Sequence, residues 1–138
     1  MTGGTYTILF ELPEATAVEV GALGDCDLPA GYYGYTGSAF GPGGFSRVDR
    51  HYELAAGDRA ARHWHIDYVL GDTAAEMRGD VRTPAVDIEC AVARSLPSGP
   101  VDGFGASDCG CETHLCHATD GGRLRELVAE SHREHSES

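Results

Sequence analysis

Tyrosine, arginine and histidine side chains near the N-terminus are of the types and spacing that could act together on a phosphate ester. Tyr6 ends a Gly-x-Tyr motif, Tyr35 begins a Tyr-x-Gly motif, and Arg47 and His51 lie one helical turn apart in the segment that follows. Hydrolysis of a phosphodiester needs a base to activate water, a cation to stabilise charge on the phosphate and a metal ion to assist the leaving oxygen. Hydroxyl, imidazole and guanidinium groups are of the kinds that could supply the base and the cation.

The two tyrosine motifs and the arginine-bearing segment resemble the GIY-YIG nuclease superfamily, in which such motifs lie on adjacent strands before a helix that carries an arginine. The stretch from Tyr35 to His51 looks especially like the homing-endonuclease branch. Nearly all of the chain also resembles a family of uncharacterised small proteins related to that superfamily, some fused to endonuclease III. The resemblance implies that Tyr6 and Tyr35 orient or deprotonate water, that Arg47 binds the scissile phosphate and that His51 assists proton transfer.

The resemblance also implies one metal-binding glutamate on a later helix, for which Glu89 is the candidate, with magnesium or manganese as the ion. The function that follows is a metal-dependent phosphodiesterase acting on DNA or RNA. A catalytically inactive nucleic-acid-binding module of the same fold is an alternative. A simpler explanation of Glu89 itself is that an acidic residue stabilises the start of a helix through the helix dipole.

A second set of residues is expected to contact the substrate. Gly37, Ser38 and Arg50 adjoin the catalytic candidates in the sequence. The segment 63–70 alternates like a strand, and alternate strand residues share a face, so they could coordinate a metal or bind a phosphate. The residues on that face are His63, His65 and Asp67. The alternative is a polar strand face packed beside the first helix.

A third candidate is a zinc site with Cys90, Cys109, Cys111 and His114 as ligands. The protein would then be a zinc-stabilised adaptor. The chain has five cysteines. An odd number without an export signal indicates reduced thiols or metal ligands and argues against a disulfide framework. A single residue separates Cys109 from Cys111, unlike the usual zinc knuckle or ribbon, so the spacing favours reduced, buried cysteines.

The charge balance bears on habitat and on partners. The chain has 22 acidic and 10 basic residues, a net charge of −12, and every basic residue is an arginine. An acidic, lysine-free surface suits a protein in concentrated salt, which screens charge and competes for water. We therefore predict a halophilic cytoplasm. Because salt weakens both repulsion and counterion release, nucleic acid stays a possible partner, bound through shape, hydrogen bonds and a few arginines.

The elements that must position these residues predict an α+β fold. Strands are expected over 5–12, 17–23 and 32–37 as a three-stranded antiparallel meander, with a further strand over 63–70. The extra strand 17–23 accounts for the long interval between the two tyrosines. Helices are expected over 45–56, 86–96 and 124–132, from apolar residues at helical spacing. The prediction is one GIY-YIG-like domain over 1–132, with a frayed polar tail over 133–138.

The apolar stretches of the sequence are short. They fall below the roughly 20 residues that a membrane-spanning helix needs, so no membrane partner is expected. The N-terminus lacks the basic start and apolar middle of an export signal, which predicts a cytoplasmic protein. No internal repeat or heptad appears, and the sequence does not specify an oligomeric state.

Overall fold

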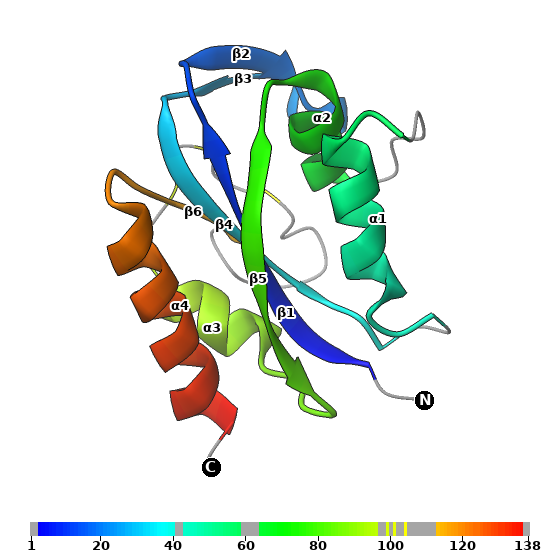
Figure 1. Cartoon of the computed structure of the whole chain (residues 1–138), viewed down its shortest axis with the longest axis vertical. Coiled ribbons are helices and arrows are strands. Elements are labelled where there is room, and N and C mark those ends of the chain that lie inside the picture. Colours follow the sequence, from blue (N-terminus) through cyan, green and yellow to red (C-terminus); the bar gives the residue numbers. More distant parts are fainter. Residues whose placement is uncertain are drawn as a thin grey trace.

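The computed structural model describes residues 3–40, 43–58, 64–96, 99, 101, 104 and 113–136. It confirms the α+β class: a central antiparallel sheet has α1 and α2 on one side and α3 and α4 on the other (Figure 1). No helix in these ranges is both long and apolar enough to cross a membrane.

The central sheet has the strand order β5-β1-β4-β6, and all neighbouring strands are antiparallel. The strands are β5 (Glu76–Pro84), β1 (Gly4–Leu12), β4 (Gly31–Ser38) and β6 (Leu115–Ala118). Strand β1 is rich in β-branched and aromatic residues and is buried along almost its whole length. Such a composition suits a strand with neighbours on both edges and helices on both faces.

The strand pairing of the predicted three-stranded meander is wrong. Strand β1 does not pair with the second strand of the chain; its partners are β4 and β5. Strands β2 (Thr16–Glu19) and β3 (Asp25–Leu28) pair with each other as a separate two-stranded sheet around a short 3₁₀ helix, η1 (Gly21–Leu23). These strands are too short to satisfy the backbone of β1, whereas β4 matches nearly its whole length. The extra strand is thus one half of an inserted hairpin.

Strand β5 was not predicted, and its composition explains why. Its sequence alternates charged residues with small or apolar ones, contains Gly79 and ends at Pro84, and no residue in it is fully buried. Glycine and proline weaken a strand assignment, but both are tolerated at the edge of a sheet. Strand β5 forms because its backbone hydrogen-bonds to β1. Its own residue types do not predict a strand.

The predicted strand over 63–70 is also wrong, because the structure has helix α2 (His65–Asp72) there. Ile66, Val69 and Leu70 are buried together, which fits helical spacing as well as the apparent alternation. The Asp67 carboxylate accepts the backbone N–H of Trp64 at 3.0 Å, which stabilises the start of the helix.

The other three helices lie where they were predicted. They are α1 (Ser46–Ala55), α3 (Glu89–Ser95) and α4 (Gly121–Ser136). Because α4 extends through Ser136, the expected fraying of the tail is wrong for residues 133–136. Strand β6 begins at Leu115, where the sequence indicated only the end of a glycine-rich connection.

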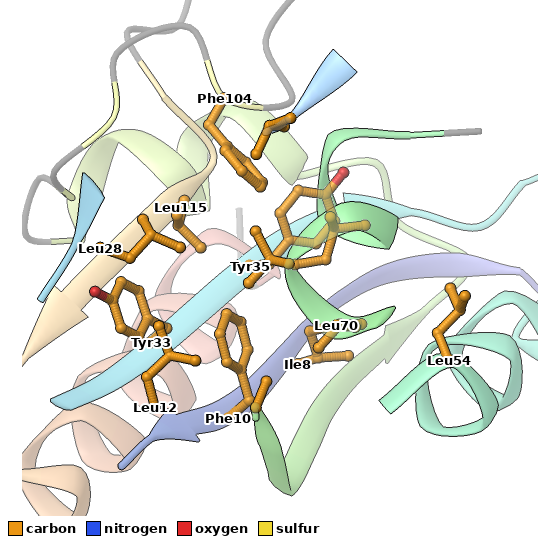
Figure 2. Close-up of a cluster of buried hydrophobic side chains, with 14 of the residues drawn as sticks. Ile8, Phe10, Leu12, Leu28, Tyr33, Tyr35, Leu54, Leu70, Phe104 and Leu115 are labelled. Atoms are coloured by element: carbon orange, nitrogen blue, oxygen red, sulfur yellow. The ribbon is translucent and has the colours of Figure 1, made fainter. Parts of the chain in front are cut away.

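Two hydrophobic cores lie on opposite faces of the sheet. Alternation along β1 sends Ile8 and Phe10 toward α1 and α2, and Leu9 toward α3 and α4. Tyr33 and Tyr35 belong to the first core, where they lie with side chains from several strands and helices (Figure 2). The candidate tyrosines therefore face the helix that carries Arg47 and His51.

Candidate active site

A buried hydrogen bond joins Tyr6 of β1 to His51 of α1. The Tyr6 hydroxyl lies 2.7 Å from His51 Nε2, and the two residues are 2% and 0% exposed. Helical spacing explains the geometry, because His51 lies one turn after Val48 and three residues before Leu54, on the buried face of α1. His51 therefore points into the core toward Tyr6.

Gly37 makes room for this pair. It is the cross-strand partner of Tyr6, and a Cβ atom built on Gly37 would lie 2.6 Å from the Tyr6 hydroxyl oxygen. A larger residue would displace the Tyr6 ring. The glycine of the Tyr-x-Gly motif therefore leaves space for the Tyr6 ring. Gly37 is buried, whereas a contact with substrate was expected for it.

Tyr35 approaches His51 from the neighbouring strand. Its ring lies edge-on to the imidazole with centroids 6.1 Å apart, and its other side packs against Phe104 at 5.9 Å. The Tyr6 ring is 5.5 Å from the same imidazole. Both tyrosines thus converge on one histidine.

Arg47 adds a cation to the cluster. Its Nη1 donates to the Ser38 carbonyl oxygen at 2.5 Å, and the residue is partly exposed. Its charge lowers the pKa of both Tyr6 and Tyr35 against the larger effect of burial. Ser38 thus contributes its backbone oxygen, which holds Arg47 in place.

Burial controls the protonation of the three central groups. It raises the pKa of Tyr6 and of Tyr35, and neighbouring negative charges that include Glu89 and Asp67 raise them further. Burial also lowers the pKa of His51 to about 4. Both tyrosines and the histidine are therefore neutral near pH 7. The Nδ1 atom of His51 is buried and has no hydrogen-bond partner among the described residues.

Arg50 is not available as predicted, because it forms a two-pronged ion pair with Asp67. The two N–O distances are both 2.9 Å, and Asp67 is completely buried. The expected polar face of His65 and Asp67 is wrong, since the segment is a helix and not a strand. His65 packs against Phe104 with centroids 5.6 Å apart. His63 lies outside the described residues.

Glu89 belongs to the same site. It is the first residue of α3, its side chain is 27% exposed, and its Oε2 lies 3.2 Å from His114 Nδ1. Its negative charge contributes to the raised pKa of both Tyr6 and Tyr35, after the larger effect of burial.

The proposed zinc ligands are only partly covered by the structure. Cys109 and Cys111 lie outside the described residues, Cys90 is a partly exposed thiol, and His114 adjoins Glu89. Within the described ranges, no group of three or more His, Cys, Asp or Glu residues could hold a metal ion.

Trp64 is a site residue that the sequence analysis missed. The guanidinium carbons of Arg47 and Arg50 each lie 4.7 Å from the centroid of its ring. No local spacing signals this contact, because Trp64 follows both arginines by more than ten residues and meets them only when α2 packs beside α1. The only sequence feature that could have drawn attention to Trp64 is that it is the one tryptophan of the chain.

The fold and the site define a small α+β domain in which two tyrosines converge on one histidine. Residues 5–137 match the family described as domain of unknown function DUF123, and the chain belongs to that family. Searches of curated proteins and of solved structures each found no significant match.

Proposed function

We propose that this domain is a metal-dependent nucleic-acid phosphodiesterase of the GIY-YIG type that works in a salt-rich cytoplasm. The observation that carries the proposal is the convergence of Tyr6, Tyr35, His51 and Arg47 from two strands and one helix, with Glu89 close by. Residues far apart in the sequence supply the donors, acceptors and charges that phosphodiester hydrolysis requires.

The Tyr6–His51 pair supports a proton-transfer role. A raised pKa keeps Tyr6 protonated, so it cannot act as a preformed phenolate base. Its O–H can donate to Nε2 of the neutral His51, and the hydroxyl can then accept a proton from water as its own proton passes to the imidazole. Because His51 is fully buried, its role in this scheme is exerted through Tyr6.

Arg47 supports phosphate binding. Its guanidinium donates one hydrogen bond to the Ser38 carbonyl oxygen, and an arginine has five N–H donors in total. The remaining donors suit two oxygens of a phosphate group. The bond to Ser38 orients the side chain before the substrate arrives, which favours catalysis because less ordering is needed on binding.

Glu89 is the residue that would hold magnesium or manganese. Magnesium is usually bound by one or two carboxylates together with waters and substrate phosphates, so a single partly exposed glutamate fits. When bound, the ion would stabilise negative charge on the leaving oxygen. His114 would orient the Glu89 carboxylate from the other side.

An inactive nucleic-acid-binding module is the second candidate function. The observation that favours it is the burial of Tyr6 and His51, which limits direct access of water to the proposed base. In that case Arg47 would still bind phosphate, and the tyrosine–histidine pair would only support the fold.

The test is a cleavage assay in concentrated potassium chloride with magnesium or manganese, using single-stranded, duplex and branched DNA and RNA. Arg47→Ala and Glu89→Gln are each expected to lower the rate at least about a hundredfold, as for the loss of a transition-state contact. Arg123→Ala and Glu126→Gln, which alter an exposed pair on α4, are matched controls. Unchanged cleavage in Arg47→Ala would reject the site. Binding without turnover, weakened by Arg47→Ala, would support the inactive module.

A further inference from the structure

Two large apolar side chains are strongly exposed among the described residues, and one of them, Trp64, contacts Arg47. Trp64 is 40% exposed and Phe40 is 49% exposed. The Trp64 ring contacts the Arg47 guanidinium, and Phe40 lies two residues beyond Ser38, whose carbonyl oxygen accepts from Arg47. We call Arg47 and Trp64 the aromatic patch.

The indole of Trp64 is held in place by its surroundings. Asp67 binds the Arg50 guanidinium with both carboxylate oxygens and also accepts the backbone N–H of Trp64. Arg50 in turn lies against the Trp64 ring at 4.7 Å. One buried carboxylate therefore holds both the backbone of Trp64 and a cation that contacts its ring. An aromatic group fixed in this way loses little conformational freedom when a ligand stacks on it.

Exposed aromatic rings beside an arginine are typical of surfaces that stack unpaired bases, since every base has a π-face and the arginine can bind the adjoining phosphate. Bases inside an intact duplex are covered by their neighbours and reach such a ring only when they are unstacked. Stacking also suits a chain with a net charge of −12, because salt weakens phosphate contacts more than it weakens stacking.

We infer that the aromatic patch binds a nucleic acid with an unpaired base next to the phosphate at Arg47, with Trp64 as the main stacking surface. The substrate class is therefore single-stranded or locally unpaired DNA or RNA. This inference rests on the phosphate-binding role given to Arg47 in the proposed function.

The first experiment uses Trp64 as its own reporter, because it is the only tryptophan in the chain. Its fluorescence is followed during titration with a short oligothymidylate, the matching oligouridylate and a duplex of equal length. We expect quenching by the single strands at concentrations about tenfold or more below those needed for the duplex. Comparison of the DNA and RNA strands identifies the preferred nucleic acid. Equal affinity for the duplex would overturn the inference.

The second experiment uses variants and the anisotropy of a labelled oligonucleotide. Trp64→Leu retains an apolar side chain without a π-face and is expected to weaken binding about tenfold, in the range for loss of one base stack. Trp64→Tyr, which restores an aromatic face, is expected to stay within about threefold of wild type. Phe40→Leu should have a smaller effect than Trp64→Leu. Wild-type affinity in Trp64→Leu, with its fold confirmed by circular dichroism, would overturn the inference.

The two proposals fail in different ways. Trp64-dependent binding of single strands without metal-dependent cleavage would reject the phosphodiesterase and retain the aromatic patch. Cleavage that requires Arg47 and Glu89, acts on intact duplex and is unchanged in Trp64→Leu would reject the patch and retain the phosphodiesterase.

Discussion

Two buried histidines on opposite faces of the sheet differ in how their ring nitrogens are satisfied. Burial lowers the pKa of both His51 and His132 to about 4. His132 of α4 lies 2.8 Å from Thr7 Oγ1 through Nε2 and 2.9 Å from Thr83 Oγ1 through Nδ1. His51 reaches only Tyr6, and its Nδ1 has no hydrogen-bond partner in the part of the chain that the structure describes.

The difference separates a structural polar cluster from a candidate functional one. A buried polar atom without a partner costs about 1–3 kcal/mol, so most buried polar atoms are paired, and exceptions gather at functional sites. In the cluster of Thr7, Thr83 and His132, both imidazole nitrogens are paired, and the cluster joins α4 to β1 and β5. The tyrosine–histidine pair departs from this rule, beside the arginine and glutamate that could act on a substrate.

The largest expected effect is on acid stability. The folded protein takes up a proton on His51 or His132 only near pH 4, whereas the unfolded chain does so near the ordinary pKa of 6.5. Stability is therefore fully present above about pH 6.5 and is lost as the pH falls toward 4, by roughly 3 kcal/mol for each histidine. Denaturant unfolding between pH 7 and 4 measures this loss. His51→Gln and His132→Gln should each remove about half of it, and an unchanged pH dependence in either variant would contradict the assignment.

The next effect is on catalysis. Tyr6→Phe removes the hydroxyl that, in the proposed mechanism, links water to His51, and it is expected to lower kcat about a thousandfold, within the range for general acid–base groups. Tyr33→Phe is the matched control, because Tyr33 lies in the same core and its hydroxyl donates to the Pro29 carbonyl oxygen instead. Steady-state cleavage rates compare the two. Equal losses in both variants would mean that Tyr6 has only a structural role.

Removal of each imidazole tests the comparison directly. His132→Leu leaves the hydroxyls of Thr7 and Thr83 without their shared partner and is expected to destabilise the fold by about 3 kcal/mol. His51→Leu deprives only Tyr6 of a partner and removes the unpaired Nδ1, so a loss of about 1 kcal/mol is expected, together with loss of cleavage. The free energy of unfolding of both variants measures the difference. A larger loss for His51→Leu would reverse the comparison.

The smallest effects concern two glycines of β4 that face opposite sides of the sheet. A Cβ on Gly37 would meet the Tyr6 hydroxyl oxygen at 2.6 Å, and one on Gly34 would meet Cys116 Sγ at 2.8 Å. Each alanine variant should lose about 2 kcal/mol of stability through overpacking. Only Gly37→Ala is expected to lower cleavage as well, because it separates Tyr6 from His51. Equal activity of the two variants would show that the spacing at Gly37 is not critical.

The parts of the fold that could be predicted are those whose own residues carry a clear pattern. Strand β1 is apolar and β-branched throughout, and α1 has buried residues at helical spacing. Helix α2 and strand β5 could not be predicted, because the first is short enough to alternate like a strand and the second is a polar edge strand. The pairing of β1 with β4 and β5 depends on which strands match β1 in length. A short stretch of sequence does not contain that information, because the partner strands are distant in the chain.

The site was predicted from motifs, and the corrections came from packing. Tyr6, Tyr35, Arg47, His51 and Glu89 were grouped before their positions were known, and the structure brings Tyr6 and Tyr35 against His51. The misassigned residues are those whose neighbours come from another helix. Asp67 is buried against Arg50, and Trp64 meets the two arginines of α1.

The sequence by itself determined which residue types are present and where the strongest strand and helix begin, because propensity and periodicity act over a few residues. It therefore determined the α+β class, whereas the tyrosine and arginine candidates came from the resemblance of their motifs to a nuclease superfamily. Only the tertiary structure decided that Asp67 is an internal ion-pair partner, that Trp64 is exposed beside Arg47, and that one imidazole nitrogen has no partner within the described residues. Burial and pairing arise between segments distant in the chain, and local sequence does not encode those distances.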